Sequence, residues 1–397
     1  MVMVKDLTQL TLKDLWKEVK DEEDWWGDIN ERTLHMVKLI LESSLEEGLL
    51  EELQASRYQR VELRKGYRNG HYERSLSTKF GAIKSLKVPR AREGYQSKVL
   101  PHYRRRQDEI NQMVRGMFLA GVSTRRVGEV LATVNGEKVS AQTVSRIASS
   151  LDTEVQLFQN RPLSDRYQYL FLDGISLKVK GAGRVHKRQV LCAYGITLLG
   201  KREIINFRQA TDESEAKWEA FLRDLYERGL EGKNCELVVT DGCPGLHKAL
   251  ETVYPYVAYQ RCWVHKLRNV ANKLRVKDRE NCLAGARLIY LAGHRKEAIS
   301  AYKNWELKWR SDYPDAVNCL GKNLDELLSF LDMPVAHRVK VRTTNVIERA
   351  FREVRRRTRP MSCFTNSRSV DRIIYGVISH LNQNWKEKPL LEFTQQS

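Results

Sequence analysis

Residues 167–179 read YQYLFLDGISLKV, and this stretch decides the class of fold. Residues 167–172 are so apolar that a strand here cannot be exposed to water on both faces. Asp173 comes directly after this apolar run and is followed by Gly174. An unpaired carboxylate in such poorly solvated surroundings costs on the order of several kcal/mol. Asp173 therefore needs a cation or another partner nearby.

The pattern downstream alternates between strands and helices. The expected elements are, in order, strands at 187–200 and 201–210, a helix at 211–230, a strand at 235–242, a helix at 244–253 and a strand at 256–265. With the strand at 167–179, this gives three strands, a helix, a strand, a helix and a strand. The order resembles the ribonuclease H-like fold, so we expect an α/β domain with a mixed sheet.

A second strand is expected to end like the first, at Asp241-Gly242. Two carboxylates at the ends of neighbouring strands repel each other unless a cation or an ion pair relieves them. A third candidate is Glu348, within the helical segment NVIERAFREVRRRTRP at 345–360. Glu353 lies about 140° further round that helix and is expected to form ion pairs in solvent.

The acids Asp173, Asp241 and Glu348 would serve as both metal ligands and catalytic residues. Their hard oxygen atoms favour Mg²⁺, with Mn²⁺ as a plausible substitute. Two such ions about 3.5–4 Å apart can promote in-line phosphoryl transfer. Three purely structural carboxylates are the alternative.

The net charge is +18, and it is unevenly distributed. Residues 1–55 contain 14 acidic and 6 basic side chains, whereas the rest of the chain is strongly basic. This imbalance favours a polyanionic partner, above all nucleic acid, over a generically basic protein. The sequence shows no apolar run of membrane-spanning length and no signal-peptide pattern at its start. Seven scattered cysteines suit a reducing cytoplasm, where the chain would associate with the nucleoid.

Two segments are candidate DNA-binding elements. Residues 64–94 predict a basic β-hairpin with its turn at Asn69-Gly70, although basic hairpins are often simply solvated. Residues 121–151 predict two short helices joined at Asn135-Gly136, with Ser140 as the N-cap of the second helix. We interpret this pair as a helix-turn-helix; a plain helical hairpin is the alternative.

Several ordered segments together resemble the Mutator-type transposases of bacterial insertion sequences. They are RNGHYERSL at 68–76, GVSTRRV at 121–127, VSAQTVSRI at 139–147, LDGISLKV at 172–179, VTDGCPGL at 239–246, RCWVHKLRNV at 261–270 and TTNVIERAFREVRRRTRP at 343–360. The resemblance covers nearly the whole chain. It implies a transposase of the DDE type with a ribonuclease H-like catalytic domain, whose acidic triad falls on Asp173, Asp241 and Glu348.

The resemblance also places a Cys-x-x-His element, Cys262 and His265, at the border of the active site. Read from the residues alone, this pair could be half of a zinc site completed by Cys282 or His294, or His265 could be structural. The segment between Asp241 and Glu348 is too long for one strand and one helix, so we expect an α-helical insertion. Within it, Trp305 and Trp309 are expected in a core rung rather than stacked on DNA.

We expect six regions along the chain. The first three are an acidic helical region at 1–55, a basic hairpin region at 56–105 and a helix-turn-helix region at 106–160. The catalytic domain follows in two parts, at 161–272 and 341–397, separated by a helical insertion at 273–340. The predicted DNA contacts are Arg68, Arg125, Arg126, Gln142, Thr143, Arg146, Lys266, Arg268, Arg338, Lys340, Arg342, Arg349, Arg352, Arg355 and Arg356.

The function expected from these features is binding to terminal inverted repeats of double-stranded DNA, followed by Mg²⁺-dependent strand cleavage and transfer into target DNA. Coordinated work on two ends implies a homodimer, and the acidic N-terminal helices are candidate dimer elements. A DNA-binding regulator without catalysis and a nuclease that only hydrolyses are the two alternatives.

Overall fold

The computed structural model describes residues 25–101, 104–181, 183–359 and 363–393, so residues 1–24 of the acidic region lie outside it. The chain divides into two compact units, Met1–Ala148 and Ser149–Ser397. Among the described residues, no helix combines the length and the apolar character needed to cross a membrane. The finer division into six regions stays a prediction.

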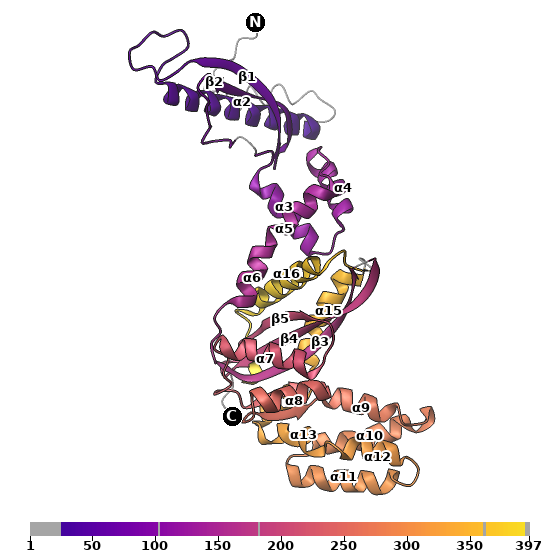
Figure 1. Ribbon diagram of the computed structural model, residues 1–397. Coiled ribbons are helices and arrows are strands. Elements are labelled where there is room, and N and C mark those ends of the chain that lie inside the picture. Colours follow the sequence, from indigo (N-terminus) through magenta and orange to yellow (C-terminus); the bar gives the residue numbers. More distant parts are fainter. Residues whose placement is uncertain (1–24, 102–103, 182, 360–362, 394–397) are drawn as a thin grey trace. The chain divides into compact units, whose positions relative to one another are not determined.

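In the first unit, helix α2 (Trp25–Leu53) lies along a hairpin of two antiparallel strands, β1 (Arg68–Thr78) and β2 (Gly81–Ala91) (Figure 1). The helix contributes Leu34, Val37, Leu41 and Leu45 to a core shared with the hairpin. Their helical spacing is the one seen in the sequence. This apolar face is therefore used within the chain, and dimerisation through the acidic region stays a prediction.

The predicted hairpin exists, but its turn was placed wrongly. The chain reverses at Lys79-Phe80, with Thr78 paired to Gly81, whereas Asn69-Gly70 lies at the start of β1. There the register shifts between Arg68 and His71, and Gly70 adopts a φ of 66°. The glycine thus supplies its positive φ to a β-bulge instead of a tight turn.

Three helices complete the first unit: α3 (Asp108–Leu119), α4 (Thr124–Asn135) and α5 (Ala141–Ser149). Gly136 ends α4 with a φ of 75°, and the Ser140 hydroxyl accepts a hydrogen bond from the Thr143 N–H at 3.2 Å. These features confirm the predicted turn and cap. The helical spacing of Val127, Val130 and Leu131 predicts that all three face inward. Val127 and Leu131 are buried, but the prediction is wrong for Val130, which is 37% exposed.

The second unit is mixed α/β and begins with α6 (Leu151–Asn160). Within the described residues its sheet has five strands in the order β5-β4-β3-β6-β7. The strands are β3 (Tyr167–Gly181), β4 (Arg184–Thr197), β5 (Arg202–Ala210), β6 (Leu237–Thr240) and β7 (Ala258–Arg261). Strands β3, β4 and β5 are antiparallel, and β6 and β7 join them in parallel. This arrangement confirms the predicted element order and is compatible with a ribonuclease H-like fold.

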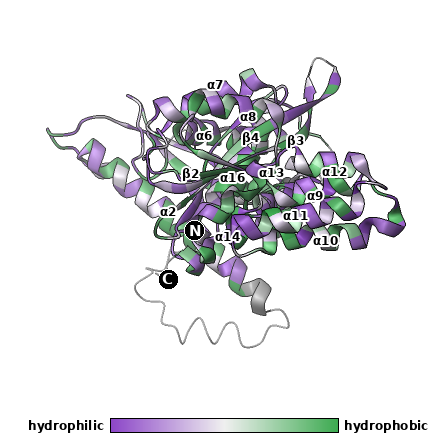
Figure 2. Cartoon of the chain, turned by 90° about the horizontal axis from the view of Figure 1, so that it is seen from below, coloured by the Kyte–Doolittle hydropathy of each residue, from purple (hydrophilic) through white to green (hydrophobic). Residues whose placement is uncertain are grey.

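Helices cover both faces of this sheet (Figure 1). On one face, α7 (Glu215–Glu227) and α8 (Pro244–Val253) bury residues such as Trp218 and Leu246 against Leu170 and Leu172 of β3. On the other face lie α15 (Asn345–Thr358) and α16 (Ser367–Trp385), where Trp385 packs edge-on against Tyr194. Figure 2 shows hydrophobic and hydrophilic residues interleaved along such helices, as expected for helices with one buried face.

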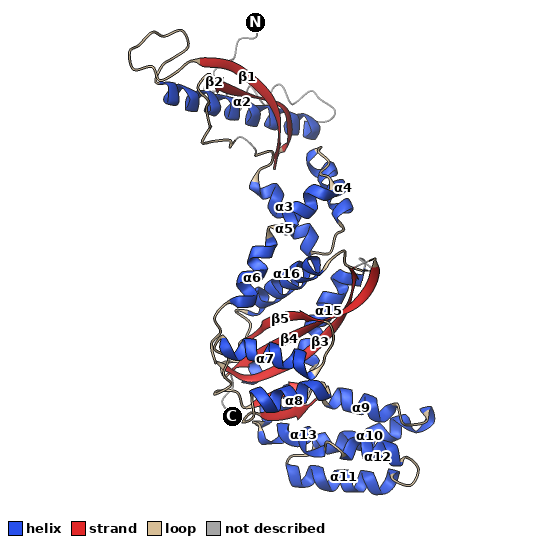
Figure 3. Cartoon of the chain, in the orientation of Figure 1, coloured by secondary structure: helices blue, strands red, loops and turns tan. Residues whose placement is uncertain are grey.

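The strand predicted to run through residue 265 ends earlier, at Arg261. Helix α9 (Trp263–Ala271) begins there, with the Lys266 N–H bonded to the Cys262 carbonyl. From α9 to α15 the described chain is helical (Figure 3), as predicted. The intervening helices are α10 (Arg279–Leu291), α11 (Arg295–Trp309), α12 (Pro314–Gly321), α13 (Leu324–Leu328) and α14 (Val335–Val341). Trp305 and Trp309 are buried in this segment, which confirms the predicted core rung.

Candidate active site

Asp173 lies within β3 and not at its end, so that part of the prediction is wrong. The strand continues to Gly181 because it pairs with β4 over its whole length. Its parallel partner β6 stops much earlier, with Thr240 opposite Leu172. Asp173 is therefore the first residue of β3 beyond the parallel pairing, where the sheet becomes open on that side.

Asp241 follows the last residue of β6 and is held by a tight turn. Its Oδ1 accepts a hydrogen bond from the Cys243 N–H at 2.9 Å, and Gly242 has a φ of 93°. The Arg261 guanidinium donates to the Gly242 carbonyl at 3.0 Å, and a Cβ on Gly242 would lie only 2.6 Å from Arg261 Nη1. Only glycine fits this turn, because of both the backbone angle and the arginine.

Glu348 stands in the first turn of α15, on the face of the sheet opposite α7. The helix starts after Thr344, whose carbonyl accepts from the Glu348 N–H at 3.0 Å. The Thr344 hydroxyl lies 3.2 Å from Glu348 Oε1, and His265 Nδ1 lies 3.8 Å from the same oxygen. The carboxylate is thus oriented by a hydroxyl and an imidazole while its side chain remains 34% exposed.

The Cys-x-x-His pair contacts the start of α15. The Thr344 N–H donates to Cys262 Sγ at 3.3 Å, and the Thr344 hydroxyl lies 3.3 Å from the same sulfur. A hydrogen bond to Cys262 raises the pKa of His265 to about 9, against the effect of burial, with further support from the charge of Glu348. Burial raises the pKa of Cys262, but hydrogen bonds from His265 and Thr344 outweigh it and leave the pKa lowered. The pair therefore ties α9 to Glu348.

The charges of Asp241 and Glu348 both affect the pKa of Asp173. Burial raises the pKa of Asp173 to about 7, and the charges of Asp241 and, more weakly, Glu348 add to this rise. The Gly174 N–H, which donates to Asp173 Oδ1 at 2.8 Å, and the charge of His265 act in the opposite direction. As these side chains stand, no three His, Cys, Asp or Glu residues of the described chain are grouped as a metal-binding set.

Glu353 behaves as expected for the second glutamate of α15. Its carboxylate pairs with Arg356 at 3.0 Å and with Arg357 at 2.7 Å. The structure thus confirms that the two glutamates of this helix differ in their surroundings.

The predicted DNA contacts fall into three groups. Lys266 is buried and donates to Asn323 Oδ1 at 2.9 Å, and the Arg338 guanidinium donates to backbone carbonyls of three residues. Neither cation is free to reach a phosphate at the surface, so we leave both out of the proposed contacts. Arg68 pairs with Glu46, Arg342 lies over the Tyr290 ring, and Lys340 pairs with Glu392. The exposed members are Arg125, Arg126, Gln142, Arg146, Arg268, Arg349, Arg352, Arg355 and Arg356, with Thr143 partly exposed.

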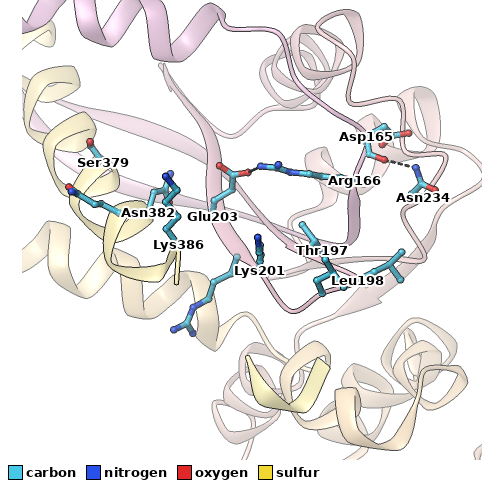
Figure 4. Close-up of a pocket in the computed structure, with 13 residues that line it drawn as sticks. Asp165, Arg166, Thr197, Leu198, Lys201, Glu203, Asn234, Ser379, Asn382 and Lys386 are labelled. Carbon is cyan, nitrogen blue, oxygen red and sulfur yellow. Dashed lines mark hydrogen bonds and ion pairs between the residues drawn. The ribbon is translucent and has the colours of Figure 1, made fainter. Parts of the chain in front are cut away.

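Two cavities lie beside these elements. One of about 440 Å³ is markedly cationic and is lined by Arg202, Lys340, Arg349, Arg352, Glu353, Arg356 and the rings of Tyr194 and Trp385, among others. The other, of about 980 Å³, lies by the start of β3 and the β4–β5 turn (Figure 4), where Arg166 pairs with Glu203. Its lining in the described chain includes none of the three acids, so it is separate from the candidate active site.

Arg261 is a site residue that the sequence did not single out. It braces the turn after Asp241 and is itself held by Glu326 of α13 at 2.8 Å. Its partner lies 65 positions away, in the segment that the sequence predicts to be helical. Helical periodicity does not say which helix packs beside the turn after Asp241, so no local pattern could have revealed this role.

Comparison with known proteins gives a consistent result. The family model described as "Transposase, Mutator family" matches residues 8–388. The transposase for insertion sequence element ISRM5 of Rhizobium meliloti is 34% identical over 89% of this chain and 88% of its own. That for IS406 of Burkholderia multivorans is 36% identical over 84% and 86% of the two chains. That for IS256 in transposon Tn4001 of Staphylococcus aureus is 34% identical over 88% and 90%.

Proposed function

Because the chain belongs to the Mutator family of transposases, we propose that it binds the terminal inverted repeats of an insertion sequence and cleaves and joins DNA strands with Mg²⁺. The observation that carries this proposal is the placement of Asp173, Asp241 and Glu348. Asp173 is the first residue of β3 beyond its pairing with β6, Asp241 directly follows β6, and Glu348 lies in the first turn of α15. The charges of Asp241 and Glu348 both act on the buried Asp173 carboxyl group. The catalytic class would be that of DDE transposases, in a ribonuclease H-like domain interrupted by the helical segment.

The donor set suits a hard divalent cation. Carboxylate oxygens are preferred by Mg²⁺, and the raised pKa of Asp173 signals negative charge that a cation would relieve. When bound, a pair of such ions activates an attacking water or 3′-hydroxyl and stabilises the leaving oxygen. Asp173, Asp241 and Glu348 would hold the ions, and the three side chains have to approach one another to do so. His265 and Thr344 would orient Glu348 for this purpose.

The DNA contacts are proposed on the exposed cations. Arg349, Arg352, Arg355 and Arg356 extend from the helix that carries Glu348, and several of them line the cationic cavity of about 440 Å³. Phosphate contacts of this kind position a duplex without reading its sequence. Sequence reading is assigned to Gln142 and Thr143 in the first turn of α5 and to Arg146 in its last turn, in a helix-turn-helix with α4. Coordinated cutting of two ends makes a homodimer the expected assembly.

The test is a strand-transfer assay on oligonucleotides that carry the element's end, with Mg²⁺. We expect Asp173→Ala, Asp241→Ala and Glu348→Ala each to lower the rate by at least about 100-fold, since each removes an oxygen donor from the site. Glu353→Gln, on the same helix, is the matched control and should keep the chemical step. Full activity of any of the three alanine variants would contradict the assignment.

A second substrate separates transposition from simple hydrolysis. With a pre-cut end that presents a 3′-hydroxyl, the proposal predicts a joined product. Water as the sole nucleophile would identify a nuclease instead, and metal-independent binding without any product would identify a regulator.

A further inference from the structure

Glu213 lies beside the acidic residues, near the start of the helix that the sequence predicts over residues 211–230. It stands in the loop between β5 and α7, and its side chain is half-buried. Its carboxylate rests against Gly174, the neighbour of Asp173, so closely that a Cβ on residue 174 would overlap Oε1. A side chain at position 174 would therefore displace the Glu213 carboxylate, which is the far end of a flexible side chain.

The backbone of Glu213 is fixed to the turn that holds Asp241. The Cys243 thiol donates to the Glu213 carbonyl at 3.5 Å. Gly245 also packs against this loop, since a Cβ there would lie 2.9 Å from the Glu213 carbonyl oxygen. The loop before α7 and the turn after β6 therefore form one packed unit, which sets the position of the Glu213 side chain.

The Glu213 carboxylate has no structural partner within the described residues. Neither an ion pair nor a side-chain hydrogen bond to it is found there, although the chain carries a net charge of +18. Burial raises its pKa, and the charge of Asp241 raises it further. Glu215, two positions on, shows the ordinary arrangement: it is exposed and lies 3.4 Å from the Lys248 ammonium. A half-buried carboxylate without a cation, beside another carboxylate, is costly unless a ligand brings positive charge.

The two faces of the sheet meet at this point. Consecutive residues of a strand point to opposite faces, so the Asp173 side chain is on the α15 face and position 174 is on the α7 face. Strand β6 ends at Thr240, and Asp241 follows it at the open edge between the two faces. Asp241 can therefore act with Asp173 and Glu348 from one side and with Glu213 from the other.

We propose that Glu213 is a fourth carboxylate of the divalent-cation site, supplying an oxygen to the hydrated ion beside Asp241 from the α7 face. This inference rests on the proposed function, because it assumes a cation at Asp173, Asp241 and Glu348. It assigns to Gly174 the role of leaving room for Glu213.

The experiment measures Mn²⁺ binding to the full chain by electron paramagnetic resonance of the free ion, together with the melting temperature in EDTA. Glu213→Gln removes the charge, and Gly174→Ala displaces the carboxylate while leaving it in the chain. Both should raise the Mn²⁺ dissociation constant about 10- to 100-fold. Glu215→Gln is the matched control and should bind Mn²⁺ like the wild type. In EDTA, Glu213→Gln should melt no lower than the wild type, because it removes an unpaired charge.

The inference is overturned if Glu213→Gln and Glu215→Gln have the same Mn²⁺ dissociation constant. It is also overturned if Glu213→Gln lowers the melting temperature in EDTA and leaves the Mn²⁺ dissociation constant unchanged. Should Glu213→Gln fail to fold, the Mn²⁺ affinity of Gly174→Ala decides. Asp241→Asn separates this inference from the proposed function. Loss of Mn²⁺ binding in Asp241→Asn but not in Glu213→Gln refutes only the role of Glu213, whereas a wild-type chain that does not bind Mn²⁺ refutes both.

Discussion

At the scale of a single residue, Asp173 should make the metal-free chain sensitive to pH. Its pKa is about 7 in the folded chain against 3.8 for the ordinary group, so between these values the folded state holds a proton that the unfolded state has released. Folding stability contributed by this residue therefore falls as pH rises from about 4 to about 7, by on the order of a few kcal/mol. Asp173→Asn carries no such charge and should be the more stable chain above pH 7.

The measurement is the melting temperature of both chains in EDTA between pH 4 and 8. The advantage of Asp173→Asn should grow up to about pH 7 and then level off. Parallel curves for the two chains would show that Asp173 is not buried among other carboxylates.

Single residues also show how far the sequence could go. The nearness of Asp173 to Asp241 could be predicted, because each follows an apolar run that forms a strand and a carboxylate in that position is physically unusual. The position of Glu213 could not be predicted, because glutamates are common in front of helices. Its place beside Gly174 depends on how α7 packs. Asp173 was wrongly expected at a strand end because the apolar run stops there. Strand β3 continues as an arm paired with β4, and a polar residue within a strand does not end it.

At the scale of elements, Glu46 links α2 to the hairpin. Its carboxylate pairs with Arg68 and His71 of β1, and these two bonds outweigh burial and lower its pKa. A carboxyl group whose pKa is lowered in the folded state stabilises the fold at pH values above its ordinary pKa of 4.5. This stabilisation is lost as the pH falls through the pKa of the folded state. We expect Glu46→Gln to destabilise the chain at pH 7 by about 1 kcal/mol or less.

Urea unfolding of the two chains at pH 7 and at pH 3 measures this effect, with Glu47→Gln on the same helix as control. The difference between wild type and Glu46→Gln should shrink at pH 3. An equal difference at both pH values would mean that the link is not ionic.

The periodicity of apolar residues predicted which helices and strands form the second unit better than it predicted where each one ends. The alternation and the apolar runs gave β3, β4, β5, α7, β6, α8 and β7 in the right order, because each buries a face of matching period. The turns were harder. Asn69-Gly70 suits a tight turn and a bulge equally well, and in the structure it forms the bulge at the start of β1. Helix α9 begins at Trp263, and its N-cap residue Cys262 accepts a hydrogen bond from the Thr344 N–H, a contact between distant segments that no local pattern predicts.

At the scale of the whole molecule, the basic charge should appear in the salt dependence of DNA binding. Each phosphate contact adds about 0.9 to the slope of log affinity against log salt. We expect Arg352→Ala and Arg356→Ala each to lower that slope by about one, because both guanidinium groups are exposed on the helix that carries Glu348. Lys303→Ala, an exposed cation on α11, should leave the slope unchanged. Fluorescence anisotropy of a labelled duplex over a salt series measures the slopes, and equal slopes for all four chains would contradict the proposed contact surface.

The most direct measurement of the central claim is the position of Mn²⁺ in crystals of the chain with a DNA end, located by anomalous diffraction. We expect peaks at coordination distance from carboxylate oxygens of Asp173, Asp241 and Glu348. Peaks bound by none of these residues, or by only one of them, would contradict it.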